Sequence, residues 1–317
     1  MKKIRIILPV LNEQSVILKF VTELTKVLEN LKKHEFSILF VVDKSQDNTE
    51  NIIEDICKND TRFEAIIMST RFGHQECLYA GLRNSLNYDA IIMMDCDLQH
   101  PPEIINQMIE KFENGYEIVN TSRYGNNKRN FLKRIGTNFF YNLVKKFAIP
   151  NFEKNSSDFR LISKKVNNKI IENFNETKIL LRGIISLVGF KTYNIKFYEK
   201  ERIEGKSKYN LKRMIHFGIE SFLSFTSYPL FILFYAGIFL SLISFAIFVY
   251  LLISYFIDNF PDGWTTIVLL QIIFGSINLF FIGFLAIYIS KIFDEVKARP
   301  KYIIDRIITF KEKNKRD

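Results

Sequence analysis

The sequence predicts an α/β domain with a mainly parallel sheet, followed by two transmembrane helices. Short apolar segments alternate with amphipathic segments over residues 1–198. This alternation is typical of a parallel sheet with helices on both faces. Two long segments without a charged residue follow, at 229–257 and 264–290. Each exceeds the roughly 20 residues that cross a bilayer core.

Each predicted strand is a short apolar run that ends at a proline or a polar cluster. The strands are expected at residues 4–8, 36–42, 63–68, 90–94, 117–121, 158–162 and 192–198. The helices between them repeat apolar residues every three or four positions, as a helix with one buried side does. They are expected at residues 14–31, 49–58, 74–86, 103–113, 130–148, 164–174 and 178–188, and Asn12 is expected to cap the first.

The chain is expected to divide at the membrane. Residues 1–210 would form a cytosolic domain, and residues 228–291 would form the two spans. Between them, residues 211–227 would be either an amphipathic helix at the membrane surface or an ordinary domain helix. Residues 292–317 would form a basic cytosolic tail that is helical from Lys301. Both flanks of the spans are basic, whereas the linker at 258–263 has two acidic residues and no basic one. The positive-inside rule therefore places both termini in the cytoplasm.

Charge and cysteine usage narrow the class of protein. The formal net charge is +10. Because the basic residues concentrate near the spans and at the C-terminus, they suit anionic lipid headgroups or a lipid phosphate better than nucleic acid. The three cysteines, Cys57, Cys77 and Cys96, have no metal-binding spacing, and we interpret them as reduced cytosolic thiols.

The segment Asp95-Cys96-Asp97-Leu98-Gln99-His100-Pro101-Pro102-Glu103 follows a predicted buried strand and carries the strongest chemical signal. Carboxylate and amide oxygens suit Mg²⁺ or Mn²⁺, which bind proteins through one or two carboxylates together with substrate phosphates. The alternative is that Asp95 and Asp97 are turn and cap residues only. His74 and His100 belong to no spaced histidine cluster, so neither is predicted to bind a metal.

Other polar loops follow the strand ends and complete a recognisable pattern. They are Pro9 to Glu13, Asp43 to Thr49, Thr121-Ser122-Arg123-Tyr124, Asp158-Phe159-Arg160, Arg182-Gly183 and Gly205-Lys206-Ser207-Lys208-Tyr209. Together with the aspartate segment, they resemble glycosyltransferase family 2 over roughly residues 1–290. The resemblance is strongest to the polyisoprenyl-phosphate glycosyltransferases, which include dolichol-phosphate mannose synthases and bactoprenol glucosyltransferases.

The resemblance implies a GT-A fold and inverting transfer of one sugar from a nucleotide-sugar to the phosphate of a membrane polyprenol. It also implies two sets of binding residues. The nucleotide-sugar set is Pro9, Asn12, Glu13, Asp43 and Asp95, and the set for Mg²⁺ or Mn²⁺ is Asp95, Asp97 and Gln99. Asp47 would shape the loop from Asp43 to Thr49 or would cap the helix that begins at Thr49.

The resemblance further implies groups that act on the sugar and the acceptor. Asp158 would be a base or would orient the acceptor, unless it only pairs with Arg160. Cationic candidates around the diphosphate and the acceptor are Arg123, Arg182, Arg202 and Lys208. Lys133, Arg134 and Ser207 would contact the acceptor phosphate.

The function expected is transfer of glucose from UDP-glucose to undecaprenyl or dolichyl phosphate at a lipid surface. Val42 and Lys44 stand where the family commonly has the first aspartate and the glycine of D-D-G-S. The sequence therefore does not decide which nucleobase the donor carries or which sugar is transferred. The alternatives are a GDP-mannose-dependent mannose synthase, a processive polysaccharide synthase and a non-catalytic membrane scaffold. Whether the chain forms a homo-oligomer is also open.

Overall fold

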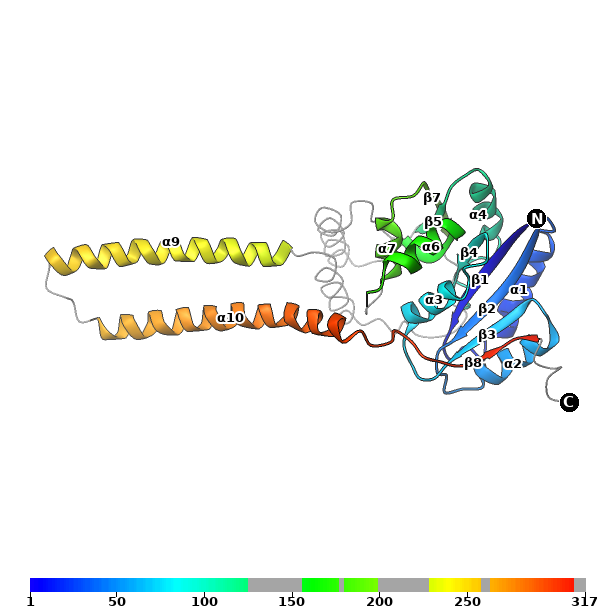
Figure 1. Ribbon diagram of the computed structural model, residues 1–317, viewed down its shortest axis with the longest axis horizontal. Helices are drawn as coiled ribbons and strands as arrows, with labels where there is room; N and C mark the ends of the chain where they lie inside the picture. Colours follow the sequence, from blue (N-terminus) through cyan, green and yellow to red (C-terminus); the bar gives the residue numbers. More distant parts are fainter. Residues whose placement is uncertain (125–155, 177–179, 199–227, 258–262, 311–317) are drawn as a thin grey trace. The chain divides into compact units, whose positions relative to one another are not determined.

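The computed structural model describes residues 1–124, 156–176, 180–198, 228–257 and 263–310 (Figure 1). The helices predicted at 130–148 and 211–227 lie outside these residues. The chain divides into two compact units, one of Met1–Arg213 with Pro300–Asp317 and the other of Met214–Arg299.

The first unit is built on an eight-stranded sheet with the strand order β7-β5-β6-β4-β1-β2-β3-β8. The strands are β1 (Lys2–Val10), β2 (His34–Val42), β3 (Phe63–Met68), β4 (Ala90–Met93), β5 (Ile118–Tyr124), β6 (Ser156–Ser163), β7 (Thr192–Tyr198) and β8 (Ile304–Ile308). Four neighbouring pairs are parallel, and β6 and β8 pair antiparallel with their neighbours. The mainly parallel α/β sheet predicted from the sequence is confirmed.

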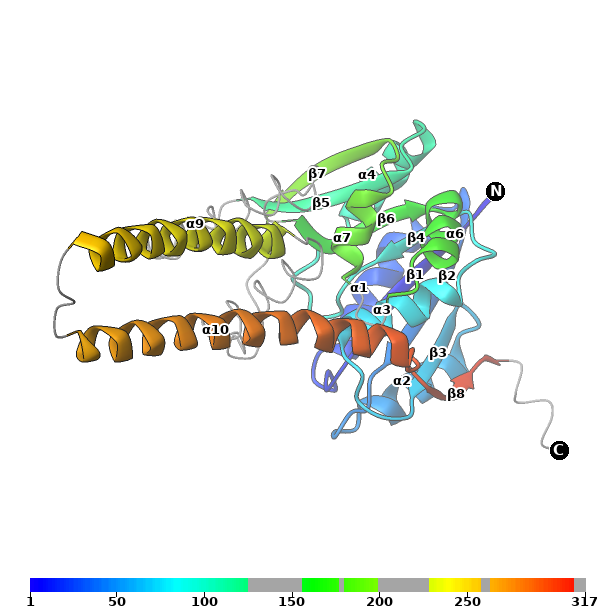
Figure 2. The same cartoon turned by 60° about the vertical axis from the view of Figure 1, so that its left-hand side comes forward.

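Helices cover both faces of this sheet (Figure 2). The helices are α1 (Ile17–Glu29), α2 (Thr49–Asn59), α3 (His74–Arg83), α4 (Ile104–Glu113), α6 (Lys164–Asn173) and α7 (Leu181–Leu187). The first, second and fourth share one hydrophobic core with one side of the strands, and α3, α6 and α7 share a second core with the other side. This burial on both faces explains why the central strands are continuous apolar runs rather than alternating ones.

The predicted start of the first helix is wrong by one turn. Helix α1 begins at Ile17, and Asn12 does not cap it. Asn12 instead adopts a left-handed backbone conformation, with φ of 54°, which asparagine tolerates better than most residues. Its side-chain oxygen accepts a hydrogen bond from the backbone N–H of Gln46 at 2.8 Å, so tertiary contact overrides the local capping signal.

The helix predicted from Lys301 onward is also wrong, because this segment contains strand β8. The strand pairs antiparallel with β3, with Ile66 opposite Ile307 and Ala65 opposite Ile308. An isolated segment of this length has no local reason to be extended. The otherwise unpaired edge of β3 supplies the hydrogen-bond partners that make it a strand.

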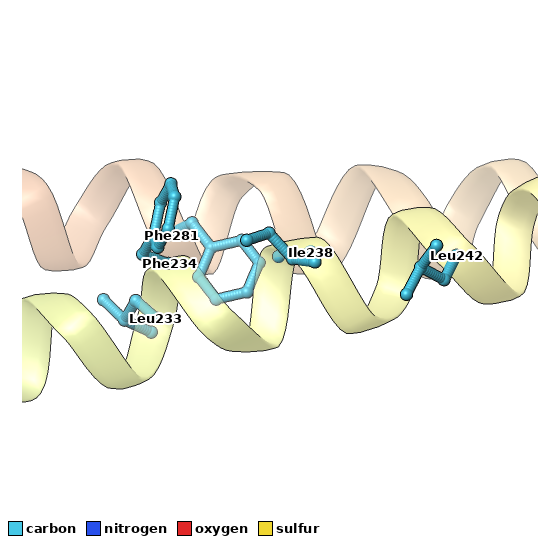
Figure 3. Close-up of a pocket in the computed structure, with 6 residues that line it drawn as sticks. Leu233, Phe234, Ile238, Leu242 and Phe281 are labelled. Atoms are coloured by element: carbon cyan, nitrogen blue, oxygen red, sulfur yellow. The ribbon is translucent and has the colours of Figure 1, made fainter.

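The second unit contains two long apolar helices, α9 (Tyr228–Ile257) and α10 (Trp264–Lys297). Both are long and apolar enough to cross a membrane, and their apolar windows are not buried by protein. A groove of about 490 Å³ lies against them. It is lined by Leu233, Phe234, Gly237, Ile238 and Leu242 of α9 and by Phe281 of α10 (Figure 3).

Candidate active site

The polar residues singled out in the sequence meet at one edge of the sheet. The parallel strands β1, β2 and β4 end there, and ligands of such sheets bind beyond the carboxyl ends of the strands. Because β6 runs antiparallel to β4, it begins at this same edge. The register pairs Met93 with Arg160, which brings Asp158 alongside the segment that follows β4 and carries Asp95.

Asp95 is held between two histidines. Its Oδ1 lies 2.8 Å from Nε2 of His74, the first residue of α3. Its backbone N–H donates to Nδ1 of His100 at 3.0 Å. Burial alone would raise the pKa of the Asp95 carboxyl, but the hydrogen bond to His74, the charge of His74 and the charge of Arg123 hold it well below its usual range. Asp95 is therefore an anion at neutral pH.

His74 is the cationic partner of this pair. Burial would lower its pKa, but the hydrogen bond to Asp95 and the charges of Asp95 and Asp158 raise the pKa of His74 to about 9. An opposite charge this close favours the protonated ring. The sequence predicted no role for His74, because it lies 21 residues from its partner and no local pattern connects them.

His100 has a different role, as a buried neutral clamp. Since its Nδ1 accepts the Asp95 N–H, its proton lies on Nε2, which donates to Oγ of Ser157 at 2.7 Å. Burial accordingly lowers the pKa of His100. The ring stacks on Phe159 with centroids 5.1 Å apart and meets Phe197 edge-on at 6.1 Å. His100 thus joins the aspartate segment to the start of β6.

Asp97 and Gln99 provide oxygen atoms on the same segment. Along residues 95–100, the partly exposed Asp95, Asp97 and Gln99 alternate with buried neighbours. Oδ1 of Asp97 accepts the Gln99 N–H at 3.1 Å, and Leu98 between them has a φ of 60°. A left-handed leucine is strained, and such strain persists where surrounding structure enforces it, often at functional sites.

These three residues fit part of a divalent-cation site. Their donors are hard oxygen atoms, the type that Mg²⁺ and Mn²⁺ prefer. In the described part of the chain, no three His, Cys, Asp or Glu residues come together as a metal cage. A cation here would therefore need further oxygens from substrate phosphates or water, which is how Mg²⁺ is commonly bound.

Asp158 and Arg182 form the second half of the site. Nη2 of Arg182 lies 3.2 Å from Oδ2 of Asp158, and the buried Arg160 is farther, at 3.8 Å from Oδ1. Arg160 also donates to the backbone oxygen of Ser157 at 2.7 Å. Burial would raise the pKa of Asp158, but Arg182 and Arg160 together lower it. The expected pairing with Arg160 is present, and Arg182 is the closer partner.

Asp43 is buried and holds a neighbouring loop. Its carboxylate accepts the backbone N–H groups of Lys44, Phe72 and Gly73 at 3.2, 2.8 and 3.0 Å. Phe72 and Gly73 directly precede His74. The contact with this loop had no signal in the sequence, and it gives Asp43 a part in placing the Asp95 partner.

The first two strand-end loops are tied together. The N–H of Asn12 donates to Oγ of Ser45 at 3.2 Å, and the N–H of Glu13 donates to Oγ1 of Thr49 at 2.9 Å. Asp47 accepts from Gln14 N–H at 3.4 Å and from Thr49 N–H at 3.1 Å. Asp47 therefore shapes the loop and accepts the first N–H of α2, but the N-cap residue of this helix is Asn48.

The remaining candidates divide into placed and undescribed residues. Pro9 lies near the end of β1, where its carbonyl oxygen is 3.8 Å from Sγ of Cys96. Arg123 lies at the end of β5, and its charge reaches Asp95. Five candidates lie outside the described residues: Lys133, Arg134, Arg202, Ser207 and Lys208.

Residues 5–171 match the family model described as glycosyl transferase family 2. The chain belongs to glycosyltransferase family 2. Similarity to curated relatives extends over nearly the whole length. The chain is 34% identical over 302 residues to an uncharacterized glycosyltransferase of Bacillus subtilis, YkcC, covering 95% of this chain and 93% of the relative.

Other relatives carry a more specific name. The chain is 34% identical over 307 residues to a bactoprenol glucosyl transferase of Shigella phage SfII, covering 96% of this chain and 98% of that protein. Among solved structures, it is similar to glucosyl-3-phosphoglycerate synthase from Mycobacterium tuberculosis, with 15% identity, a TM-score of 0.48, and coverage of 71% of this chain and 80% of that chain. The family resemblance predicted from the sequence is confirmed.

Proposed function

We propose that this family 2 member transfers glucose from UDP-glucose to a polyprenyl phosphate, with inversion at the sugar. The observation that carries the proposal is that His74 connects the two halves of the site. It binds Asp95, which shares its segment with Asp97 and Gln99, and it feels the charges of the Asp158–Arg182 pair at the same end of the strands. The chain that holds this arrangement is similar to a bactoprenol glucosyl transferase over 96% of its length. A single in-line displacement of the nucleotide by the acceptor phosphate would invert the anomeric carbon.

The donor half of the site would be formed by the aspartate segment. Asp95, Asp97 and Gln99 would hold Mg²⁺ or Mn²⁺ against the diphosphate. The cation would supply stabilisation of the negative charge that builds on the nucleoside diphosphate as the glycosidic bond breaks. Because Asp95 is already bound to His74 at 2.8 Å, we assign most of the protein contacts with the cation to Asp97 and Gln99.

The acceptor half would be formed by Asp158 and Arg182. A phosphomonoester is largely ionised near neutral pH, with a second pKa of about 6, so it needs little help from a base. Arg182 would bind the acceptor phosphate, and Asp158 would fix the guanidinium orientation through their 3.2 Å contact. The lowered pKa of Asp158 favours this orienting role over proton abstraction.

The two apolar helices would anchor the enzyme where its lipid substrate resides. We propose that α9 and α10 span the membrane and that both termini are cytoplasmic, because the flanks are basic and the linker is acidic. Sugar transfer would then occur at the cytosolic face. Anionic lipids would contact the basic residues that flank the spans.

A donor screen tests this function. Membranes containing the full chain would be incubated with labelled UDP-glucose, UDP-GlcNAc or GDP-mannose, with undecaprenyl or dolichyl phosphate as acceptor. We expect label in the lipid fraction with UDP-glucose, and the anomeric configuration of the product should be β. Preferential labelling from GDP-mannose would replace glucose with mannose. No transfer from any donor would refute the enzymatic function.

A further inference from the structure

The segment that follows α10 contacts the helix that carries His74. This segment, Pro300–Ile308, is termed the strap. Nζ of Lys301 lies 4.3 Å from the ring centroid of Tyr79 in α3 and donates to the backbone oxygen of Phe174 at 3.4 Å. Tyr302 meets the same Tyr79 ring edge-on at 6.4 Å. Tyr79 is buried and its hydroxyl also donates to the Phe174 oxygen, at 3.5 Å.

Helix α3 in turn contacts both halves of the candidate site. In its first turn, His74 holds Asp95 at 2.8 Å. The adjacent Gln75 accepts the backbone N–H of Leu181 through Oε1 at 3.1 Å. Leu181 is the first residue of α7 and the neighbour of Arg182, which binds Asp158. A small displacement of α3 would therefore move groups of the donor half and of the acceptor half together.

The strap also holds the loop before α3 through its backbone. The carbonyl oxygen of Ile303 accepts the N–H of Ser69 at 3.0 Å. Ser69 follows β3 directly and opens the loop that ends at Phe72 and Gly73, whose N–H groups bind Asp43. The strap thus contacts both elements that position His74: the loop that precedes α3 and the helix itself.

The strap is firmly attached to the rest of the first unit. Ile308 belongs to one hydrophobic core, and Tyr302 and Ile304 pack against the other. Nη2 of Arg306 lies 3.9 Å from a carboxylate oxygen of Glu50 and 3.9 Å from one of Glu54, both on α2. Strap contacts therefore join elements on both faces of the sheet.

The strap directly follows the apolar helices in the chain. The apolar unit lies in sequence between β7 and β8, the two edge strands of the sheet. Only Ala298 and Arg299 separate the end of α10 from the strap. The same nine residues thus follow the apolar hairpin directly in the chain and support the helix of His74.

From these contacts, we infer that the strap is a positioning element for sugar transfer, and that Lys301 is a positioning residue that acts through Tyr79 and α3. The expected effect on sugar-transfer kinetics rests on the proposed function, whereas the expected effect on the position of α3 does not. Lys301 contacts Tyr79 and Phe174, and neither is a predicted substrate-binding residue. Its cation holds the Tyr79 ring of α3, and its hydrogen bond goes to the Phe174 oxygen that the Tyr79 hydroxyl also binds. These contacts support the position of α3 in which His74 and Gln75 reach their partners.

The test compares three variants of the full chain. Lys301→Met keeps the side-chain length but removes the cation and the donor, and Lys301→Arg restores both. Lys297→Met is the matched control, because Lys297 also lies over an aromatic ring, that of Phe293 at 4.6 Å, and is also a basic residue beside the hairpin. Hydrogen exchange and sugar-transfer kinetics would be measured on each.

For Lys301→Met, we expect amides in residues 69–83 to exchange about tenfold faster and the donor KM to rise by about the same factor, as loss of a partly buried cation–π contact together with a hydrogen bond allows. Exchange in residues 2–31 should stay unchanged. Lys301→Arg should restore both values, and Lys297→Met should leave both as in wild type.

Three results would overturn the inference: unchanged exchange in residues 69–83, equal acceleration across the whole domain, or an equal effect of Lys297→Met. The exchange measurement needs no activity. An inactive wild type would therefore refute the proposed function while the exchange result still decides the role of the strap.

Discussion

Nε2 of His74 lies 2.8 Å from Oδ1 of Asp95, so the first aspartate of the D-x-D segment is already bound by the protein. The second oxygen of Asp95 faces Nδ1 of His100 at 3.7 Å. This Nδ1 accepts the Asp95 N–H and carries no proton to share with the carboxylate. Asp95 is therefore fixed within the scaffold by His74, and the proposed function gives Asp97 the larger share of the contact with a cation.

Replacing His100 should disturb metal binding as well as stability. His100→Ala would leave the Asp95 N–H and the Ser157 hydroxyl without their partner and open a cavity beside Phe159. We expect a loss of about 3 kcal/mol in unfolding free energy and about tenfold weaker Mn²⁺ binding in the presence of UDP. Thermal unfolding and the electron paramagnetic resonance signal of free Mn²⁺ measure these effects.

His34→Ala is the control for this prediction. His34 is also buried, but its Nε2 lies 3.4 Å from a carboxylate oxygen of Glu113. It is the first residue of β2, so it lies at the opposite end of the parallel strands from the candidate site. It should lose stability and retain Mn²⁺ affinity. Equal loss of affinity in both variants would mean that the His100 effect is general destabilisation.

The Asp158–Arg182 pair should behave as one functional unit. Asp158→Asn and Arg182→Gln should each lower kcat/KM for the acceptor by about 100-fold, because a misplaced binding group costs this much. The double variant should lose little more than either single variant, since residues in direct contact are not additive. Multiplied losses in the double variant would show that the two residues act independently.

The pH profile distinguishes the two roles considered for Asp158. Its pKa lies below the usual value, so the carboxylate is ionised throughout the range from about pH 5 to 9. The stability that the Asp158 carboxylate contributes to the folded state is present above its pKa in the unfolded chain. It is lost as the pH falls through its lower pKa in the folded protein. Asp158→Asn should therefore leave the shape of the activity profile unchanged between about pH 5 and 9. A change of the acidic limb within that range would favour the role as a base.

Membrane topology can be tested without any activity. A reporter placed after Pro261, between α9 and α10, should be extracytoplasmic. The two helices are expected to span the membrane, and the acidic linker between them would lie on its outer side. Reporters at either terminus should be cytoplasmic. A cytoplasmic signal from the linker would refute the two-span arrangement.

Local patterns in the sequence predicted most of the fold, and together with the family resemblance they named residues in both halves of the candidate site. The strands and helices of the first unit follow from apolar periodicity, and Asp95 and Asp97 were found because they follow a buried strand directly. The contacts of these residues were not predictable. His74 reaches Asp95 across 21 residues and Gln75 reaches Leu181 across 106, and no local propensity encodes such distances.

Strand β8 shows the same limit. Its segment, Ile304 to Ile308, contains two charged residues in five and follows a long helix, so continued helix was the local expectation. Its extended conformation depends on the free edge of β3, which lies more than 230 residues earlier in the chain. Edge pairing is a tertiary effect that overrides weak local preference.

The most direct test of the central claim is metal-dependent sugar transfer by Asp97→Ala. In membranes with UDP-glucose and undecaprenyl phosphate, we expect wild type to require Mg²⁺ or Mn²⁺ and Asp97→Ala to lose about 1,000-fold in rate, as removal of a transition-state contact does. Asp55→Ala removes an exposed carboxylate of α2 and should match wild type. Full activity of Asp97→Ala, or wild-type transfer that chelator leaves unchanged, would contradict the account.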